Sequence, residues 1–152
     1  MNDFKSRNEN PITEIKTVEY LDYHNINHTR YGMDALKSES PIWKIPALIR
    51  SAPDYIIFNE KNDPLFLEAK GFMGIIKIKL EDIKHYTKWN NHMDIQFLLY
   101  DIREDSYSRI MFNDILKIIK NKKPRSRSYP EGKVYYEIRK EWVPEFKTIK
   151  GE

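Results

Sequence analysis

Apolar residues recur at a helical period in three parts of this chain. In residues 11–25 the interval of three positions places Ile12, Ile15, Val18 and Leu21 along one face of a helix. A second helix, with Lys and His residues on one side, is predicted for residues 80–91, and a third for residues 111–120. These segments supply the helices of the predicted fold.

Short apolar runs bounded by turn residues predict the strands. Three of them precede the second helix, at residues 43–49, 54–58 and 65–69, and the polar residues 59–64 predict a hairpin turn between the last two. Residues 95–100 form a nearly continuous apolar run. Such a run is typical of a strand that is covered on both faces.

The rest of the chain predicts a late strand, at residues 134–138, and irregular connections. We expect a mobile loop over a site at residues 27–41, a flexible segment at 71–79 and a basic linker at 122–133. The order is therefore helix, three strands, helix, strand and a C-terminal elaboration. This α/β order predicts one mixed central sheet flanked by helices.

The composition limits the class of protein. The chain has 152 residues, the length of one domain, and its hydrophobic (40%) and aromatic (13%) contents are those of a globular protein. It has no Cys, which excludes disulfide scaffolds, thiolate zinc sites and cysteine nucleophiles. It has neither a signal peptide nor an apolar run long enough to span a bilayer. We therefore expect a single-domain, soluble cytoplasmic protein with no membrane partner.

Basic residues are concentrated in one stretch of the C-terminal third. The net charge is only +3, from 26 basic and 23 acidic residues, which is a weak indication of a nucleic-acid partner. One run without any acid can neutralise several phosphates. Its cations are Lys117, Lys120, Lys122, Lys123, Arg125 and Arg127. A solvated basic loop explains the same run equally well.

A group of charged residues predicts a site where two strands meet. Asp54 opens one strand of the predicted hairpin and Glu68-Ala69-Lys70 closes the next, so these residues are expected side by side, with Glu68 and Lys70 on the same face. Two carboxylates and the Ala69 carbonyl form an oxygen cage suited to Mg²⁺ or Mn²⁺. The Lys70 ammonium beside it can orient an attacking water. The alternative is an ordinary Glu68–Lys70 ion pair beside a simple strand entry.

These motifs resemble the PD-(D/E)xK nuclease superfamily, and within it the bacteriophage and archaeal Holliday-junction-resolving endonucleases. The residues that carry the resemblance are 43–46, 53–54, 66–71 and 94–97. The resemblance implies a restriction-endonuclease-like core over about residues 11–101, with residues 102–152 as an elaboration without a counterpart.

The resemblance also implies an activity and its residues. It implies a Mg²⁺-dependent DNA endonuclease, with Mn²⁺ able to substitute, in which Asp54, Glu68 and the Ala69 carbonyl bind metal and Lys70 positions the hydrolytic water. Members of the superfamily usually add a metal-binding acid from the first helix.

Two acids of the first helix are candidates for that role. Glu14 lies at the edge of the apolar arc, where a side chain can reach a cleft and still meet water, and we select it. Glu19 lies nearer the middle of the arc and is the second choice. For either residue, a surface acid in the N-terminal half of a helix is the alternative.

The expected partner is DNA, branched or otherwise structured, bound by a homodimer because two symmetric cuts need two active sites. A bacteriophage origin would fit the compact size. Basic residues on the second helix and in the linker are the candidates for phosphate contacts, namely Lys84, His85, Lys88, Lys122, Lys123, Arg125 and Arg127, with Lys77 and Lys79 as weaker ones. A solvated helical face explains the first three equally well.

Other functions fit the same residues. A protein of this fold that has lost its activity would bind DNA without cutting it, and it would do so without metal. A nuclease acting on RNA or on ordinary duplex DNA would use the same site. Comparing cleavage of a four-way junction, duplex DNA, single-stranded DNA and RNA separates these hypotheses.

Overall fold

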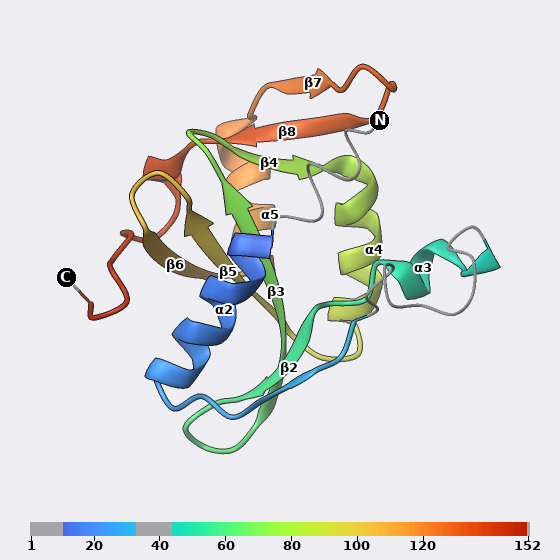
Figure 1. Cartoon of the computed structure of the whole chain (residues 1–152). Coiled ribbons are helices and arrows are strands. Elements are labelled where there is room, and N and C mark those ends of the chain that lie inside the picture. The colour runs from blue at the N-terminus through green and yellow to red at the C-terminus, as the bar shows by residue number, and fades with distance from the viewer. Residues whose placement is uncertain (1–10, 33–43, 152) are drawn as a thin grey trace.

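The computed structural model describes residues 11–32 and 44–151, which form an α/β fold with two sheets (Figure 1). The larger sheet contains, in spatial order, β1 (His28–Arg30), β2 (Tyr55–Phe58), β3 (Pro64–Phe72), β5 (Ile95–Asp101) and β6 (Ser106–Met111). β3 and β5 are parallel, and the other neighbouring pairs are antiparallel. The sheet is therefore mixed, as the order of elements predicts.

The strand β5 is buried on both faces. Ile95, Phe97 and Leu99 belong to one hydrophobic cluster and Leu98 and Tyr100 to another, and none of the five is more than 2% exposed. Successive side chains of a strand point to opposite faces of the sheet. Apolar layers must therefore cover both faces, as the continuous apolar run predicts.

One face is covered by α2 (Pro11–Tyr23), which crosses β3 and β5 (Figure 1). The predicted helix is therefore confirmed. It buries Thr13, Thr17 and Leu21, and Leu21 joins the apolar cluster on this side of the sheet. Two of the three buried residues are polar, which is unusual for the inner face of a helix.

The first half of the α2 arc that the periodicity predicts to face the core is exposed instead, whereas Val18 and Leu21 do pack against it. Ile12 and Ile15 are 43% and 59% exposed. The cause is a close approach between the helix and β3, because a Cβ added to Gly71 would lie only 2.0 Å from Thr13 Oγ1. Only a small helix residue fits against the bare backbone there. The Thr17 hydroxyl donates a hydrogen bond to the Thr13 carbonyl (2.7 Å), which satisfies one buried polar group on this face.

The opposite face is covered by α4 (Leu80–Asn90), α5 (Phe112–Lys122) and a second, antiparallel sheet (Figure 1). That sheet contains, in spatial order, β4 (Ile76–Lys79), β8 (Val134–Ile138) and β7 (Ser126–Ser128). Its inner face and the two helices enclose a cluster that includes Ile78, Tyr86, Phe97, Phe112 and Ile138. The second and third predicted helices and the late strand are confirmed.

Some predicted segments are wrong. The strand expected at residues 43–49 is replaced, within its described part, by the short helix α3 (Ala47–Arg50). Pro46 immediately precedes this helix, and Pro suits a helix start. The loop expected at residues 27–41 contains β1, and its part from residue 33 onward lies outside the described residues.

Two segments that were expected to be irregular contain strands. The segment expected to be flexible, 71–79, contains β4, and the expected basic linker, 122–133, contains β7. β7 is an edge strand whose residues are all exposed, so it has no apolar alternation. Within the described ranges, no helix combines the length and the apolar character needed to cross a bilayer.

Candidate active site

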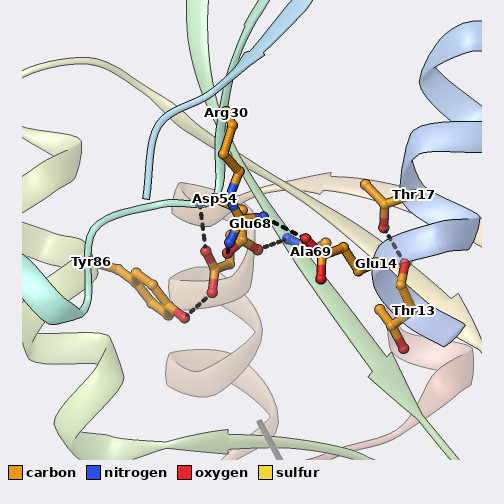
Figure 2. A network of polar contacts seen from close by, with 8 residues as sticks. All are labelled: Thr13, Glu14, Thr17, Arg30, Asp54, Glu68, Ala69 and Tyr86. Carbon is orange, nitrogen blue, oxygen red and sulfur yellow. Dashed lines mark hydrogen bonds and ion pairs between the residues drawn. The ribbon is translucent and has the colours of Figure 1, made fainter. Parts of the chain in front are cut away.

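Two carboxylates meet where β2 begins and β3 passes beside it. The antiparallel register pairs Tyr55 with Leu67, and one residue further out Asp54 lies opposite Glu68. The Asp54 amide donates a hydrogen bond to Glu68 Oε1 (3.2 Å), and the Ala69 amide donates one to Asp54 Oδ2 (3.0 Å), as Figure 2 shows. Each acid is therefore held by the backbone of the other strand.

Lys70 lies on the same face of β3 as Glu68 because the two residues are two positions apart. Its positive charge lowers the pKa of both Asp54 and Glu68, although other effects on these groups are larger. In the described part of the chain, no carboxylate lies within ion-pair distance of the Lys70 ammonium. A strong Glu68–Lys70 ion pair is therefore absent there, and Lys70 can meet a bound anion.

Tyr86 reaches the same pair of acids from α4. Its hydroxyl donates a 2.7 Å hydrogen bond to Glu68 Oε2, and its ring is 4% exposed (Figure 2). Glu68 thus accepts one bond on each oxygen, from Asp54 and from Tyr86. Asp82, one turn earlier in α4, lies close enough to raise the pKa of Glu68. The sequence pattern identified neither residue of α4.

Arg30 of β1 joins the first helix to the site. Its Nη1 lies 3.5 Å from Glu14 Oε1 and its Nη2 lies 3.8 Å from Asp54 Oδ1 (Figure 2). The guanidinium also lies 5.1 Å from the centre of the Tyr55 ring. Glu14 is therefore brought to the site, whereas Glu19 forms its ion pair elsewhere, with Lys16 (3.5 Å).

The pKa of each central carboxyl is raised in the folded protein. Burial raises the pKa of Asp54 most, and the Ala69 amide and Arg30 oppose that effect. The pKa of Glu68 is raised well above its ordinary value, first by burial and then by the neighbouring Asp54 charge. The site therefore disfavours two negative charges, and a cation bound between them would offset that cost.

The residues present fit a hard divalent cation in donor chemistry. Asp54 and Glu68 offer carboxylate oxygens, and Ala69, between Glu68 and Lys70, offers its backbone carbonyl. Glu14, which pairs with Arg30, is a further acid. Within residues 11–32 and 44–151, however, no three acidic or histidine side chains are grouped closely enough to form a ready metal site. Glu14 would need to turn from Arg30 toward Asp54 to complete one.

No protein-family model and no curated protein sequence matches the chain. Solved structures do. A Holliday junction resolvase from Archaeoglobus fulgidus superposes with a TM-score of 0.53 at 12% identity, over 88% of this chain and 91% of the resolvase. The chain has a restriction-endonuclease-like fold. A nuclease from a fusselovirus matches with a TM-score of 0.49 at 13% identity, over 91% of this chain and 81% of the nuclease.

The residues predicted to contact phosphate lie away from Asp54 and Glu68. On α4, Lys84 and Lys88 are exposed and lie about 160–200° around the helix from Tyr86. His85 lies between these faces, and its Nδ1 is buried without a hydrogen-bond partner among the described residues. The remaining candidates, Lys122, Lys123, Arg125 and Arg127, lie at the end of α5 and along β7.

Proposed function

We propose that this chain is a divalent-metal-dependent endonuclease that hydrolyses phosphodiester bonds in DNA. The observation that supports it most is the mutual hydrogen bonding of Asp54 and Glu68, with Lys70 on the same face of β3, in a restriction-endonuclease-like fold. Two partly buried acids whose pKa values are both raised by burial have a cost for folding, so a catalytic role accounts for the pair better than a structural one.

The residues of the site have distinct roles in this proposal. Asp54, Glu68 and the Ala69 carbonyl would hold Mg²⁺, or Mn²⁺ in its place, with Glu14 as a further ligand. The ion would polarise the scissile phosphate and lower the pKa of a bound water. The Lys70 ammonium orients the attacking water and stabilises the negative charge that develops on the phosphate.

Cleavage of labelled DNA tests the proposal. The wild-type protein should cut with Mg²⁺ or Mn²⁺ and not with EDTA. We expect Asp54→Ala and Lys70→Ala to reduce the cleavage rate by about a hundredfold to a thousandfold, because each removes a group that acts on the reacting phosphate. DNA binding and the melting temperature, measured in EDTA, should stay close to those of the wild type.

The design includes a control and a result that would refute the enzyme hypothesis. Lys61→Ala removes an exposed cation of the β2–β3 turn and should cut like the wild type. A wild-type protein that binds DNA in EDTA but cuts no substrate with any divalent ion would instead be a binding module. Cleavage of RNA but not of DNA would mean that the protein is a nuclease with RNA as its substrate.

We further propose branched DNA as the substrate and a homodimer as the active form. The fold's similarity to a Holliday junction resolvase supports the first, and the need for two symmetric cuts supports the second. A panel of a four-way junction, linear duplex and single strand, together with the mass of the protein in solution by light scattering, tests both. A monomer that cuts linear duplex as fast as the junction would contradict them.

Arg30 is expected to compete with the metal for the acids of the site. Its guanidinium lies between Glu14 and Asp54, so an ion bound by both acids must displace it. We expect Arg30→Ala to bind Ca²⁺, a non-hydrolysing probe, about threefold to tenfold more tightly, because half-exposed ion pairs of this kind contribute little individually. Isothermal titration calorimetry measures the affinity directly.

A matched variant controls for the loss of one positive charge. Arg139→Ala removes an arginine that pairs with Glu141 (3.8 Å), at an exposed position far along the chain from the acids of the site. It should leave the Ca²⁺ affinity unchanged. If Arg30→Ala binds Ca²⁺ no more tightly than Arg139→Ala does, Arg30 does not compete with the ion.

A further inference from the structure

The outer face of the second sheet carries a regular array of cations. In β4, Ile76 and Ile78 point into the core and are each 1% exposed, so Lys77 and Lys79 belong to the other face, where Lys77 is exposed and Lys79 is only 9% exposed. The registers of β4 with β8 and of β7 with β8 then align the side chains of that outer face in rows. One row is Lys77, Glu137 and Arg125, and the next is Lys79, Tyr135 and Arg127.

Both rows follow from the strand pairings of the second sheet. β8 pairs Glu137 with Lys77 and Tyr135 with Lys79 on one side. On the other side Tyr135 pairs with Arg127, and the Glu137 amide donates a hydrogen bond to the Arg125 carbonyl (3.0 Å), which continues the ladder by two residues. The two rows thus contain four cations and one acid, on a different sheet from the one that holds Asp54 and Glu68.

The single acid of the array pairs with one of its cations and leaves two exposed ones, Lys77 and Arg125. Glu137 forms an ion pair with Arg127, whose Nε lies 2.8 Å from Glu137 Oε1. Neither Lys77 nor Arg125 has a carboxylate within ion-pair distance in the described part of the chain, and both are exposed. Like charges on adjacent positions of a sheet face destabilise it. An anionic partner would offset that repulsion.

Aromatic rings hold the lysines of the array in position. The rings of Tyr129 and Tyr135 lie 4.4 Å apart. The Lys77 ammonium lies 5.3 Å from the centre of the Tyr135 ring and 5.9 Å from that of Tyr129, and Lys79 lies 5.8 Å from the latter. Such contacts restrict the lysine side chains before any partner binds, so less conformational entropy is lost on binding.

We infer that this outer face, which we call the β4–β8–β7 face, is a second DNA-binding surface that contacts the phosphate backbone away from the cleaved bond. Cations in rows on a sheet match a polyanion with regularly repeated charges, and backbone contacts of this kind give affinity without reading sequence. The inference concerns binding alone and needs neither metal nor cleavage. It joins Lys77, a weaker candidate from the sequence, to the basic run that the sequence predicts, and it adds the geometry of the array.

The test measures DNA affinity in EDTA as a function of NaCl concentration, with a fluorescent four-way junction and a linear duplex. The variant Lys77→Gln/Arg125→Gln removes two cations that have no ion pair among the described residues. Each lost phosphate contact should reduce the slope of log affinity against log salt by about 0.9, so the expected reduction is about 1.8. The affinity at low salt should fall at least tenfold.

The control variant Lys61→Gln/Lys150→Gln has the same net charge, with the substitutions at exposed positions elsewhere. It should retain the wild-type salt slope. Single-turnover cleavage by saturating Lys77→Gln/Arg125→Gln should also match the wild type, because the acids of the site are unchanged. If no protein, including the wild type, cuts DNA but the test and control variants still differ in salt slope, the nuclease proposal is refuted and the inference about this surface is retained.

Two results would overturn the inference. One is an equal change of slope in the test and control variants, which would mean that net charge alone governs binding. The other is a wild-type protein whose DNA affinity does not depend on salt. Circular dichroism melting checks that the test variant is folded, and it should be as stable as the wild type or more so, because two repelling charges are removed.

Discussion

Glu68→Gln should slow cleavage sharply and also stabilise the metal-free protein at neutral pH. The cleavage rate should fall by about a hundredfold to a thousandfold, since the site loses a carboxylate that we propose as a metal ligand. The gain in stability follows from the pKa of Glu68, which burial and the neighbouring Asp54 charge raise in the folded state. At neutral pH the folded protein must either keep this group charged in an unfavourable place or bind a proton to neutralise it, and a neutral amide removes that cost.

The stability that Glu68→Gln gains over the wild type depends on pH. Because the pKa is higher in the folded than in the unfolded chain, the folded state binds the extra proton first as the pH falls. The wild type therefore gains stability from neutral pH down toward the ordinary carboxyl pKa of about 4.3, where the gain is complete. The stability difference between Glu68→Gln and the wild type should be largest at pH 7–8 and disappear near pH 4.

Urea unfolding in EDTA across this pH range measures the difference. Glu145→Gln, an exposed acid outside the site, is the control and should match the wild type at every pH. A Glu68→Gln protein that is less stable than the wild type at neutral pH would mean that the hydrogen bonds from Tyr86 and Asp54 outweigh the cost of burying the charge. Cleavage within tenfold of the wild type would remove Glu68 from the proposed metal ligands.

Gly71→Ala should destabilise the protein by about 1–3 kcal/mol, the usual cost of overfilling a packed interior. The new Cβ would lie 2.0 Å from Thr13 Oγ1, and Thr13 is buried on α2, so the helix must move away from β3. Glu14 is the next residue of that helix and would move with it. Chemical unfolding measures the loss of stability, and Ca²⁺ titration measures the weaker binding that displacement of Glu14 should cause.

A double-mutant cycle separates the clash from other effects of the extra methyl group. Thr13→Ala removes the hydroxyl that the new Cβ would meet, and this hydroxyl makes no hydrogen bond among the described residues. Thr13→Ala/Gly71→Ala should therefore recover more than half of the stability that Gly71→Ala loses. An additive double variant would show that the two residues do not meet in the folded protein.

The arrangement of the central acids could be predicted from the sequence because a hairpin is local. Its short turn fixes which residues of the two strands are opposite each other, and this places Asp54 against Glu68 without knowledge of the rest of the fold. The side of α2 that faces the sheet could not be predicted in the same way. Its periodicity identifies a helix, but the space above Gly71 selects Thr13 over Ile12 as the buried residue.

Arg30 and Tyr86 could not be predicted from the sequence for a different reason. Each comes from an element that reaches the acids only through long-range packing, since β1 pairs with β2 and α4 packs between the two sheets. Neither residue belongs to a local motif. The rows of the β4–β8–β7 face were likewise hidden, because β4 and β8 are distant in sequence. The apolar run at 134–138 and the Ile–Lys alternation at 76–79 were local signs of that sheet, but neither shows that the two strands pair.

The position of Arg30 has a consequence for how the protein matures. A cluster of acids that depended on metal for charge balance would repel itself in a newly made chain wherever free divalent ions are scarce. Here an internal guanidinium already neutralises part of that charge, with Tyr55 beneath it. The chain can therefore complete its fold before any ion arrives. In the proposed nuclease, ion supply would then govern when the protein acts without deciding whether it folds.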